Sequence, residues 1–211
     1  MLELYKWNQI KYKVGILGGT FNPIHNGHIA LAKSAKLEFD LDYVLLIPTG
    51  ISYYKSEFLD GRTRLEMVLL ASECEEYLKV SDMEVKREGN TYTIDTICAL
   101  QELYPTVEFY LIIGEDTLFH IETWKKASEV LQRIPLLVAH RPSNDDRNLE
   151  EQMEHLRNLY HSQIALLEMK EVPISSSHIR KCIQSNQSVS HILDDKVWHY
   201  IQFHQLYQST S

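Results

Sequence analysis

Six short apolar runs, each followed by a segment of helical periodicity, set the strongest limit on how this chain can fold. Strands are predicted at Lys13 to Leu17, Tyr43 to Ile47, Leu78 to Ser81, Phe109 to Ile113, Leu136 to Ala139 and Ile164 to Leu167. Strands that alternate with helices form a parallel sheet, because each crossover helix returns the chain to the same end of the sheet. The pattern therefore predicts an α/β chain with a mostly parallel sheet and helices on both faces.

Helices are predicted between and after these strands, each with an apolar stripe on one side. They span Gly27 to Phe39, Arg62 to Cys74, Thr93 to Leu103, Thr123 to Gln132, Leu149 to Tyr160, Ser176 to Ser185 and Asp194 to His204. Together with the strands they predict a Rossmann-like doubly wound fold, in which the ligand lies beyond the carboxyl ends of the strands. Four polar segments begin there, and we expect one crevice to collect them: Gly18 to His28, Thr49 to Lys55, Gly114 to Asp116 and Pro173 to Arg180.

Length and charge restrict the domain organisation and the partners. The chain has 211 residues, of which 44% are hydrophobic, and its formal net charge is -8. This length favours a single domain over residues 1–211, with residues 1–12 as an N-terminal extension. The acidic balance, without a block of basic residues, argues against a nucleic acid as partner. An anionic ligand must then be held by a local pocket of basic side chains and backbone N–H groups.

The sequence gives little indication of a membrane helix, a signal peptide or disulfide bonds. No stretch approaches the roughly 20 apolar residues of a membrane helix, and the N-terminus lacks the apolar segment of a signal peptide. We therefore expect a cytoplasmic protein without a membrane partner. Cys74, Cys98 and Cys182 are odd in number and far apart, which favours free reduced thiols over disulfides. The oligomeric state is open, a homo-oligomer included.

The first predicted strand runs into Gly18-Gly19-Thr20-Phe21-Asn22-Pro23-Ile24-His25-Asn26-Gly27-His28. A strand that turns through glycines into a helix presents backbone N–H groups and the positive end of the helix dipole, which suit a phosphate. His25 and His28 are three residues apart and can place imidazole donors on one face. Zinc is the alternative, but further Cys or His ligands at metal-site spacing are missing nearby, so no protein metal site is predicted. The junction points to a nucleoside phosphate.

A second polar segment, Pro173-Ile174-Ser175-Ser176-Ser177-His178-Ile179-Arg180, places three hydroxyls at a helix start and Arg180 one turn inside. Taken alone, it is typical of a serine N-cap followed by a solvated arginine. Beside the histidine junction, a second phosphate-binding helix start becomes the favoured interpretation.

These segments carry a family resemblance. The glycine and histidine junction resembles the G-G-T-F-x-P-x-H-x-G-H signature of a nucleotidyltransferase superfamily that includes class I aminoacyl-tRNA synthetases. Pro173 to Arg180 resembles the I-S-S-T-x-I-R motif of bacterial nicotinate-mononucleotide adenylyltransferases. Three more segments are similar to motifs of that family in the same order: Arg87 to Thr96 (R-x-G-x-S-Y-T-x-D-T), Ile112 to Asp116 with Trp124 (G-x-D…W) and Ala139 to Pro142 (R-P). The resemblance spans nearly the whole chain.

The resemblance implies an enzyme that transfers the adenylyl group of ATP to nicotinate mononucleotide, giving nicotinic acid adenine dinucleotide and pyrophosphate. It implies catalytic roles for His25, His28, Lys55 and Arg180. ATP would be bound by Gly18, Gly19, Thr20, Phe21, His25, His28, Asp116, Arg141, Ser175, Ser176, Ser177 and Arg180, and the acceptor by Lys55, Tyr92, Thr93 and Trp124. Mg2+ would be bridged by the ATP phosphates, with few protein ligands.

Several of these residues have a plain structural alternative. Tyr92 and Trp124 are also typical of core aromatics. Asp116 is also typical of a helix N-cap, and Lys55 of a solvated surface charge. We interpret Arg87 and Asp95, which also lie in matched motifs, as structural.

Two positions depart from the family pattern. The loop that usually reads P-P-H-K is Ser52-Tyr53-Tyr54-Lys55 here, and Glu115 stands where a small residue is common. An adenylyltransferase with another phosphorylated acceptor, such as 4′-phosphopantetheine, therefore stays an alternative. So does a non-catalytic regulator that binds pyridine nucleotides. A tRNA synthetase is excluded by size and by the absence of a basic face.

Overall fold

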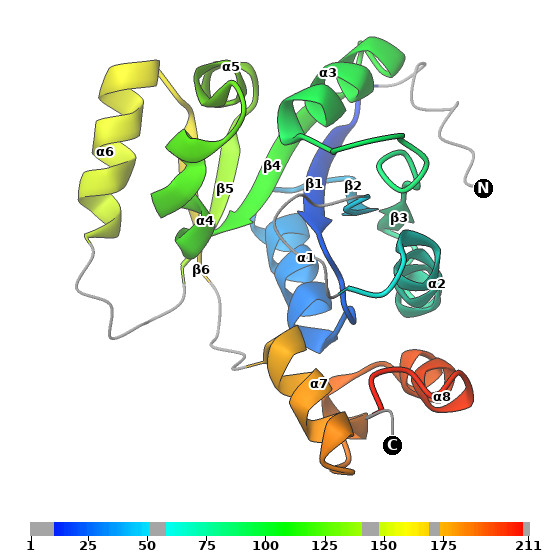
Figure 1. The fold of residues 1–211 in the computed structure, drawn as a ribbon. Helices are drawn as coiled ribbons and strands as arrows, with labels where there is room; N and C mark the ends of the chain where they lie inside the picture. The colour runs from blue at the N-terminus through cyan, green and yellow to red at the C-terminus, as the bar shows by residue number, and fades with distance from the viewer. Residues whose placement is uncertain (1–10, 51–57, 141–147, 169–173, 209–211) are drawn as a thin grey trace.

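The computed structural model describes residues 11–50, 58–140, 148–168 and 174–208, which form one six-stranded sheet with helices on both faces (Figure 1). The strands are β1 (Lys13–Gly19), β2 (Tyr43–Pro48), β3 (Leu78–Val80), β4 (Glu108–Gly114), β5 (Leu136–His140) and β6 (Ile164–Glu168). Every neighbouring pair among these strands is parallel, in the order β3-β2-β1-β4-β5-β6. Each observed strand lies within two residues of its prediction, and the doubly wound α/β fold is confirmed.

The strand order reverses at β1, which pairs with β2 on one side and β4 on the other. The helix that follows β1 packs on one face of the sheet, and the helix that follows β4 packs on the opposite face. Such a divergence opens a crevice beyond the carboxyl ends of the two strands. The predicted polar segments after β1 and β4 therefore begin at this crevice.

Side chains alternate across the sheet, so each strand contributes to two separate cores. Leu17 and Ile112 belong to the first core, and their neighbours Ile16 and Leu111 belong to the second. The first core is covered by α1 (Asn26–Glu38), α2 (Gly61–Ser72), α7 (Ser176–Gln184) and α8 (Asp195–Phe203). The second is covered by α3 (Thr93–Leu103), α4 (Glu115–His120), α5 (Ala127–Arg133) and α6 (Leu149–Tyr160).

The predicted helix from Thr123 to Gln132 is wrong in its first part. The chain instead forms the short helix α4 directly after β4, then a 3-10 turn η2 (Ile121–Thr123), and α5 begins only at Ala127. Lys126, the residue before α5, has a left-handed backbone with φ of 54°, a conformation that is costly for a residue with a side chain and interrupts a helix. Trp124 therefore lies in the connection between the two helical pieces.

Other sequence predictions can be compared with the described residues directly. The three cysteines are free, as predicted: Cys74 is exposed, Cys98 is half-buried and Cys182 is buried. None of the described helices is long and apolar enough to span a membrane. Within the described residues, no group of three or more His, Cys, Asp or Glu side chains is placed to hold a metal ion.

Candidate active site

Two histidines lie at the junction between β1 and α1, and they contact each other. His25 is the buried N-cap of α1, and its backbone N–H donates a hydrogen bond to Nδ1 of His28 over 3.2 Å. The two rings stack with their centroids 3.7 Å apart. Because Nδ1 of His28 accepts this bond, the neutral ring carries its proton on Nε2. The contact therefore makes Nε2–H of His28 a hydrogen-bond donor.

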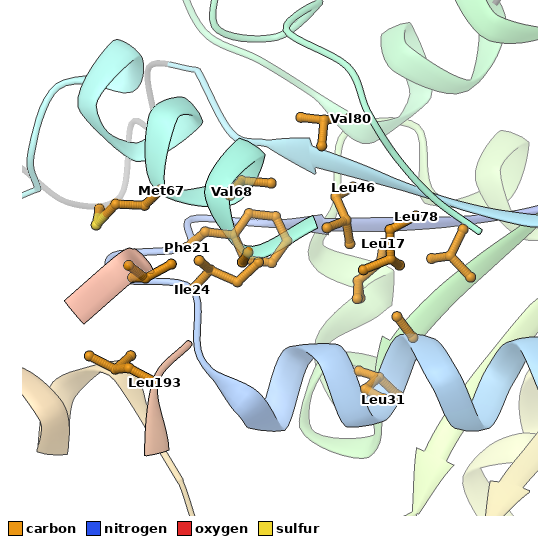
Figure 2. Close-up of a cluster of buried hydrophobic side chains, with 14 of the residues drawn as sticks. Leu17, Phe21, Ile24, Leu31, Leu46, Met67, Val68, Leu78, Val80 and Leu193 are labelled. Atoms are coloured by element: carbon orange, nitrogen blue, oxygen red, sulfur yellow. The ribbon is translucent and has the colours of Figure 1, made fainter. Parts of the chain in front are cut away.

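The loop before these histidines, residues 20–25, is anchored in the first core. Phe21 is 2% exposed and Ile24 is fully buried, and Figure 2 shows both side chains between α2 and Leu193. Phe21 has a left-handed backbone with φ of 48°, and its ring meets the His28 ring edge-on with centroids 5.0 Å apart. The side chain of Phe21 is therefore part of the core, and its predicted ATP contact would have to come from the backbone.

A buried arginine that sequence analysis did not single out ties this loop to the neighbouring strand. Arg64 of α2 donates to the carbonyl oxygens of Thr20 (2.7 Å), Thr49 (2.6 Å), Gly50 (3.2 Å) and Leu59 (2.9 Å). Burial lowers the pKa of its guanidinium, which stays charged because arginine loses its proton only far above neutral pH. An arginine in an amphipathic helix normally lies on the exposed side, so the local pattern gave no signal for this role.

The N-terminus of α7 docks against the same loop. Ser176 Oγ donates to the carbonyl oxygen of Pro23 (2.9 Å), and Nη1 of Arg180 donates to the carbonyl oxygen of Asn22 (2.8 Å). Ser175 is the N-cap of α7, and its Oγ accepts from the His178 N–H (3.2 Å). The two predicted phosphate-binding segments are 153 residues or more apart in sequence, and these bonds bring them into contact. We call the place where they meet the mouth of the site. Arg180 is not a purely solvated side chain.

Gly27 allows the first turn of α1 to approach the His25 ring closely and to pack beside Ile174, which precedes α7. A Cβ at Gly27 would lie 3.0 Å from Nδ1 of His25, closer than side chains normally pack, and 3.8 Å from Cβ of Ile174. A side chain at this position would require the His25 imidazole to shift by a few tenths of an ångström. This close approach explains the glycine between the two histidines of the motif.

A pocket of about 200 Å³ opens beside this mouth, at the ends of β1, β2 and β4. Its lining is apolar on the strand side and carries hydroxyls and one carboxylate opposite: Ile16, Gly18, Ile47, Thr49, Glu84, Thr91, Thr93, Thr96, Ile97, Leu111, Ile112, Ile113 and Trp124. Three predicted site residues, Gly18, Thr93 and Trp124, are in this lining. A Cβ at Gly18 would meet nothing within 4 Å, so Gly18 faces open space.

Glu84 is a buried carboxylate in this lining that sequence analysis did not single out. Thr96 Oγ1 donates to Glu84 Oε1 (2.7 Å), and Nη1 of Arg87 donates to Thr96 Oγ1 (3.1 Å). Burial raises the pKa of Glu84, and the Thr96 hydrogen bond and the Arg87 charge oppose that rise. A Cβ at Gly50 would lie 2.1 Å from the Glu84 carbonyl oxygen, so only glycine fits there. The structural interpretation of Arg87 fits this network.

Tyr92 and Asp116 lie at helix starts near the crevice. Tyr92 is the N-cap of α3, directly before Thr93, and Nζ of Lys125 stands 4.0 Å from its ring centroid. Asp116 is the second residue of α4, whose N-cap is Gly114. The N-cap alternative for Asp116 is therefore wrong, and its predicted contact with ATP stays a prediction.

Glu115 has a structural partner that accounts for its departure from the family pattern. His140, the last residue of β5, places Nδ1 2.7 Å from Oε2 of Glu115, whose side chain is 10% exposed. The pair joins the start of α4 to the end of β5. Arg141 and Lys55, and the sequence Ser52-Tyr53-Tyr54, lie outside the described residues.

Known proteins match nearly the whole chain. A cytidylyltransferase-like family model matches residues 16–182. A protein of Lachnoclostridium phytofermentans, named "Probable nicotinate-nucleotide adenylyltransferase", is 38% identical over 92% of this chain and 98% of its own length. A protein of the same name from Dehalococcoides mccartyi is 41% identical over 94% of this chain and 98% of its own length. This chain belongs to the nicotinate-nucleotide adenylyltransferase family.

Solved structures agree on the fold of this adenylyltransferase. Two structures of Plasmodium falciparum nicotinic acid mononucleotide adenylyltransferase, complexed with APC and with NaAD, superpose with TM-scores of 0.75 and 0.77. Both cover 93% of this chain and 97% of their own, at 19% and 20% identity. At such identity they establish the fold alone. The family resemblance drawn from the sequence motifs is confirmed by the more similar relatives.

Proposed function

We propose that this adenylyltransferase transfers the adenylyl group of ATP to nicotinate mononucleotide, forming nicotinic acid adenine dinucleotide and pyrophosphate. One observation carries the proposal: the N-termini of α1 and α7 meet after β1, and a pocket opens beside them. The names of the relatives at 38% and 41% identity support this reaction. The complex of the Plasmodium falciparum enzyme with NaAD supports it as well.

Adenylyl transfer requires positioned positive charge rather than a strong base. The acceptor phosphate is already ionised and attacks the α-phosphorus in line, displacing pyrophosphate. Nε2–H of His28, the remaining donors of Arg180 and the N–H groups in the first turn of α7 would neutralise charge as it spreads over the phosphate oxygens. Gly18, Gly19 and Thr20 would add backbone contacts, with Ser175 to Ser177 on the opposite side. Lys55 would reach the phosphates across the crevice.

The pocket would hold the pyridine ring of the acceptor. Trp124 would stack on the ring, and the N–H groups of Tyr92 and Thr93 at the positive end of α3 would receive the carboxylate. Nicotinamide would set its own N–H against one of these donors, which leaves a buried mismatch. Asp116 and Arg141 would then bind the ribose or the adenosine edge of ATP.

Mg2+ fits this site if it enters bound to ATP and not to ligands of the protein. The described groups at the mouth are hydrogen-bond donors, namely His28 Nε2–H, Arg180 and the first turn of α7, and they suit phosphate oxygens rather than a cation. Bound to the phosphates and water, Mg2+ would supply further neutralisation of their negative charge. The chain itself would contribute orientation and hydrogen bonds.

The Ser52-Tyr53-Tyr54 sequence favours a second candidate, an adenylyltransferase with another phosphorylated acceptor. Pyrophosphate release measured with nicotinate mononucleotide, nicotinamide mononucleotide and 4′-phosphopantetheine separates the candidates. We expect nicotinate mononucleotide to give the highest kcat/KM. A higher value for 4′-phosphopantetheine would support the second candidate. Tight nucleotide binding without pyrophosphate release from any acceptor would contradict both and point to the non-catalytic regulator.

A further inference from the structure

The segment that follows α8 returns to the loop between β1 and α1. Tyr207 donates a hydrogen bond from its hydroxyl to Oδ1 of Asn22 over 2.8 Å, across 185 residues of sequence. Figure 1 shows the coloured part of this segment running from α8 back toward α7. None of the motifs in the sequence includes Tyr207.

Asn22 is held from two directions. Its backbone carbonyl accepts from Arg180 (2.8 Å) and its side-chain oxygen accepts from Tyr207 (2.8 Å). Asn22 is 2% exposed, and its Nδ2 is buried without a hydrogen-bond partner among the described residues. The bond from Tyr207 therefore orients a buried amide that has no other side-chain bond there. Loss of this bond leaves the whole amide unsatisfied inside the protein, which is costly.

The conformation of Tyr207 is specified by its surroundings. Both Gln205 (φ 53°) and Tyr207 (φ 63°) have left-handed backbones, which persist in residues with side chains only where neighbouring contacts fix them. The Leu206 N–H donates to the Ile201 carbonyl oxygen (3.0 Å), and the side chains of Leu206 and Tyr207 pack on the first core. Burial raises the pKa of the Tyr207 hydroxyl, against the opposing charges of Arg180 and Arg64. The hydroxyl keeps its proton and stays a donor at neutral pH.

We infer that Tyr207 is a positioning residue of the ATP site, acting through Asn22 on the loop that carries His25 and His28. It fixes the loop without touching a substrate. The inference rests on the proposed function, because it assigns the β1–α1 loop to ATP. Of the residues predicted to bind ATP, the lining of the acceptor pocket contains Gly18 alone, so the effect of Tyr207 should fall mainly on ATP.

The test compares Tyr207→Phe with Tyr160→Phe, two changes that each remove one hydrogen-bonded hydroxyl. Tyr160 in α6 donates to Glu122 Oε1 (2.9 Å) on the opposite face of the sheet and outside the site. We expect Tyr207→Phe to raise the KM for ATP about fivefold, since a net hydrogen bond contributes about 1 kcal/mol. The KM for nicotinate mononucleotide should change less than about twofold, and Tyr160→Phe should leave both constants unchanged.

A double-mutant cycle with Asn22→Ala identifies the route of the effect. If Tyr207 acts through Asn22, adding Tyr207→Phe to Asn22→Ala raises the KM for ATP no further. Calorimetric titration with ATP provides a second measurement that does not depend on turnover. An unchanged ATP affinity in Tyr207→Phe would overturn the inference, as would equal rises in both KM values. A wild-type chain that releases no pyrophosphate would instead overturn the proposed function.

Discussion

The crevice has two sides, which we name after their proposed ligands: the phosphate side is the β1–α1 loop with the residues that bind it, and the acceptor side is the pocket that contains Glu84 and Thr96. The two sides are held together in different ways. On the phosphate side, side chains of α2, α7 and the C-terminal segment bind the β1–α1 loop across 44 to 185 residues of sequence. On the acceptor side, the buried network joins near neighbours, because Thr96 is 12 residues from Glu84 and 9 from Arg87. The phosphate side is thus held by hydrogen bonds from distant parts of the chain, whereas the buried side-chain bonds of the acceptor side stay within residues 84–96.

This difference indicates where the site can vary. A substitution in the β1–α1 loop must preserve contacts with three separate elements at once, so few side chains should be tolerated there. A change in the segment between β3 and α3 alters the pocket while leaving those long-range bonds in place. The departure from the family pattern at Ser52-Tyr53-Tyr54 falls in a loop that the resemblance assigns to the acceptor, which agrees with this division.

The largest expected effect is a loss of stability when Arg64, which binds the β1–α1 loop on the phosphate side, is replaced. Arg64→Met leaves four carbonyl oxygens without their donor, and we expect the free energy of unfolding to fall by about 3 kcal/mol. Urea denaturation gives this value. Arg62→Met, an exposed change on the same helix, is the control and should stay within about 0.5 kcal/mol of wild type. Equal losses in the two variants would show that long-range bonds do not distinguish the phosphate side.

The next effect concerns catalysis on the phosphate side. His28→Ala removes the Nε2–H donor and should lower turnover about 100-fold or more, the scale found when one transition-state donor is lost. Steady-state pyrophosphate release measures it. His155→Ala provides the control, because His155 is exposed on α6 and faces Glu122 (3.3 Å). Turnover of His28→Ala within a few fold of wild type would refute the proposed role.

A third prediction measures how selective the acceptor side is. Nicotinate mononucleotide should be preferred over nicotinamide mononucleotide about ten- to hundredfold in kcat/KM, because the amide leaves a buried mismatch of about 1–3 kcal/mol. The ratio is obtained with both acceptors at saturating ATP. Comparable rates for the two acceptors would mean that the N–H groups before α3 do not read the carboxylate.

The smallest effect is a pH dependence on the acceptor side. Burial raises the pKa of Glu84 above its usual 4.5, so its ionisation opposes folding as pH rises through the raised value. Wild-type stability should therefore decline relative to Glu84→Gln when the pH is raised from below 4.5 to neutrality. The decline should be small, because hydrogen bonds and the Arg87 charge offset much of the burial. Denaturation of both proteins across about pH 4 to 8 measures it, and a difference of the opposite sign contradicts the assignment.

Much of the fold could be predicted from sequence, because strands and helices each have a characteristic local spacing of apolar residues. Helix α3 begins and ends where the pattern predicts, from Thr93 to Leu103. The predicted helix around Trp124 was wrong for a local reason. The helix is interrupted by the left-handed backbone of Lys126, and a lysine, unlike a glycine, gives no sequence signal for that conformation. The motifs themselves predicted that the segments after β1 and before α7 meet.

The polar residues that hold the site in place could not be predicted, because each of them contacts partners that are distant in sequence. Arg64 lies in a helix of mixed polarity, and Tyr207 follows the last helix without a motif around it. Glu115 gained a physical explanation only when β5 placed His140 beside it. Long-range partners of single polar residues leave no periodicity, so they emerge only when the chain is folded.

The order of these contacts along the chain has a consequence for synthesis on the ribosome. The β1–α1 loop is translated early, but it binds Ser176, Arg180 and Tyr207 only after those residues have emerged. Domains assemble as their parts become available, and contacts between distant residues form slowly. A nascent chain that stops before residue 176 would contain the histidine motif without its contacts to Ser176, Arg180 and Tyr207, so nucleotide binding should arise only after these residues have emerged.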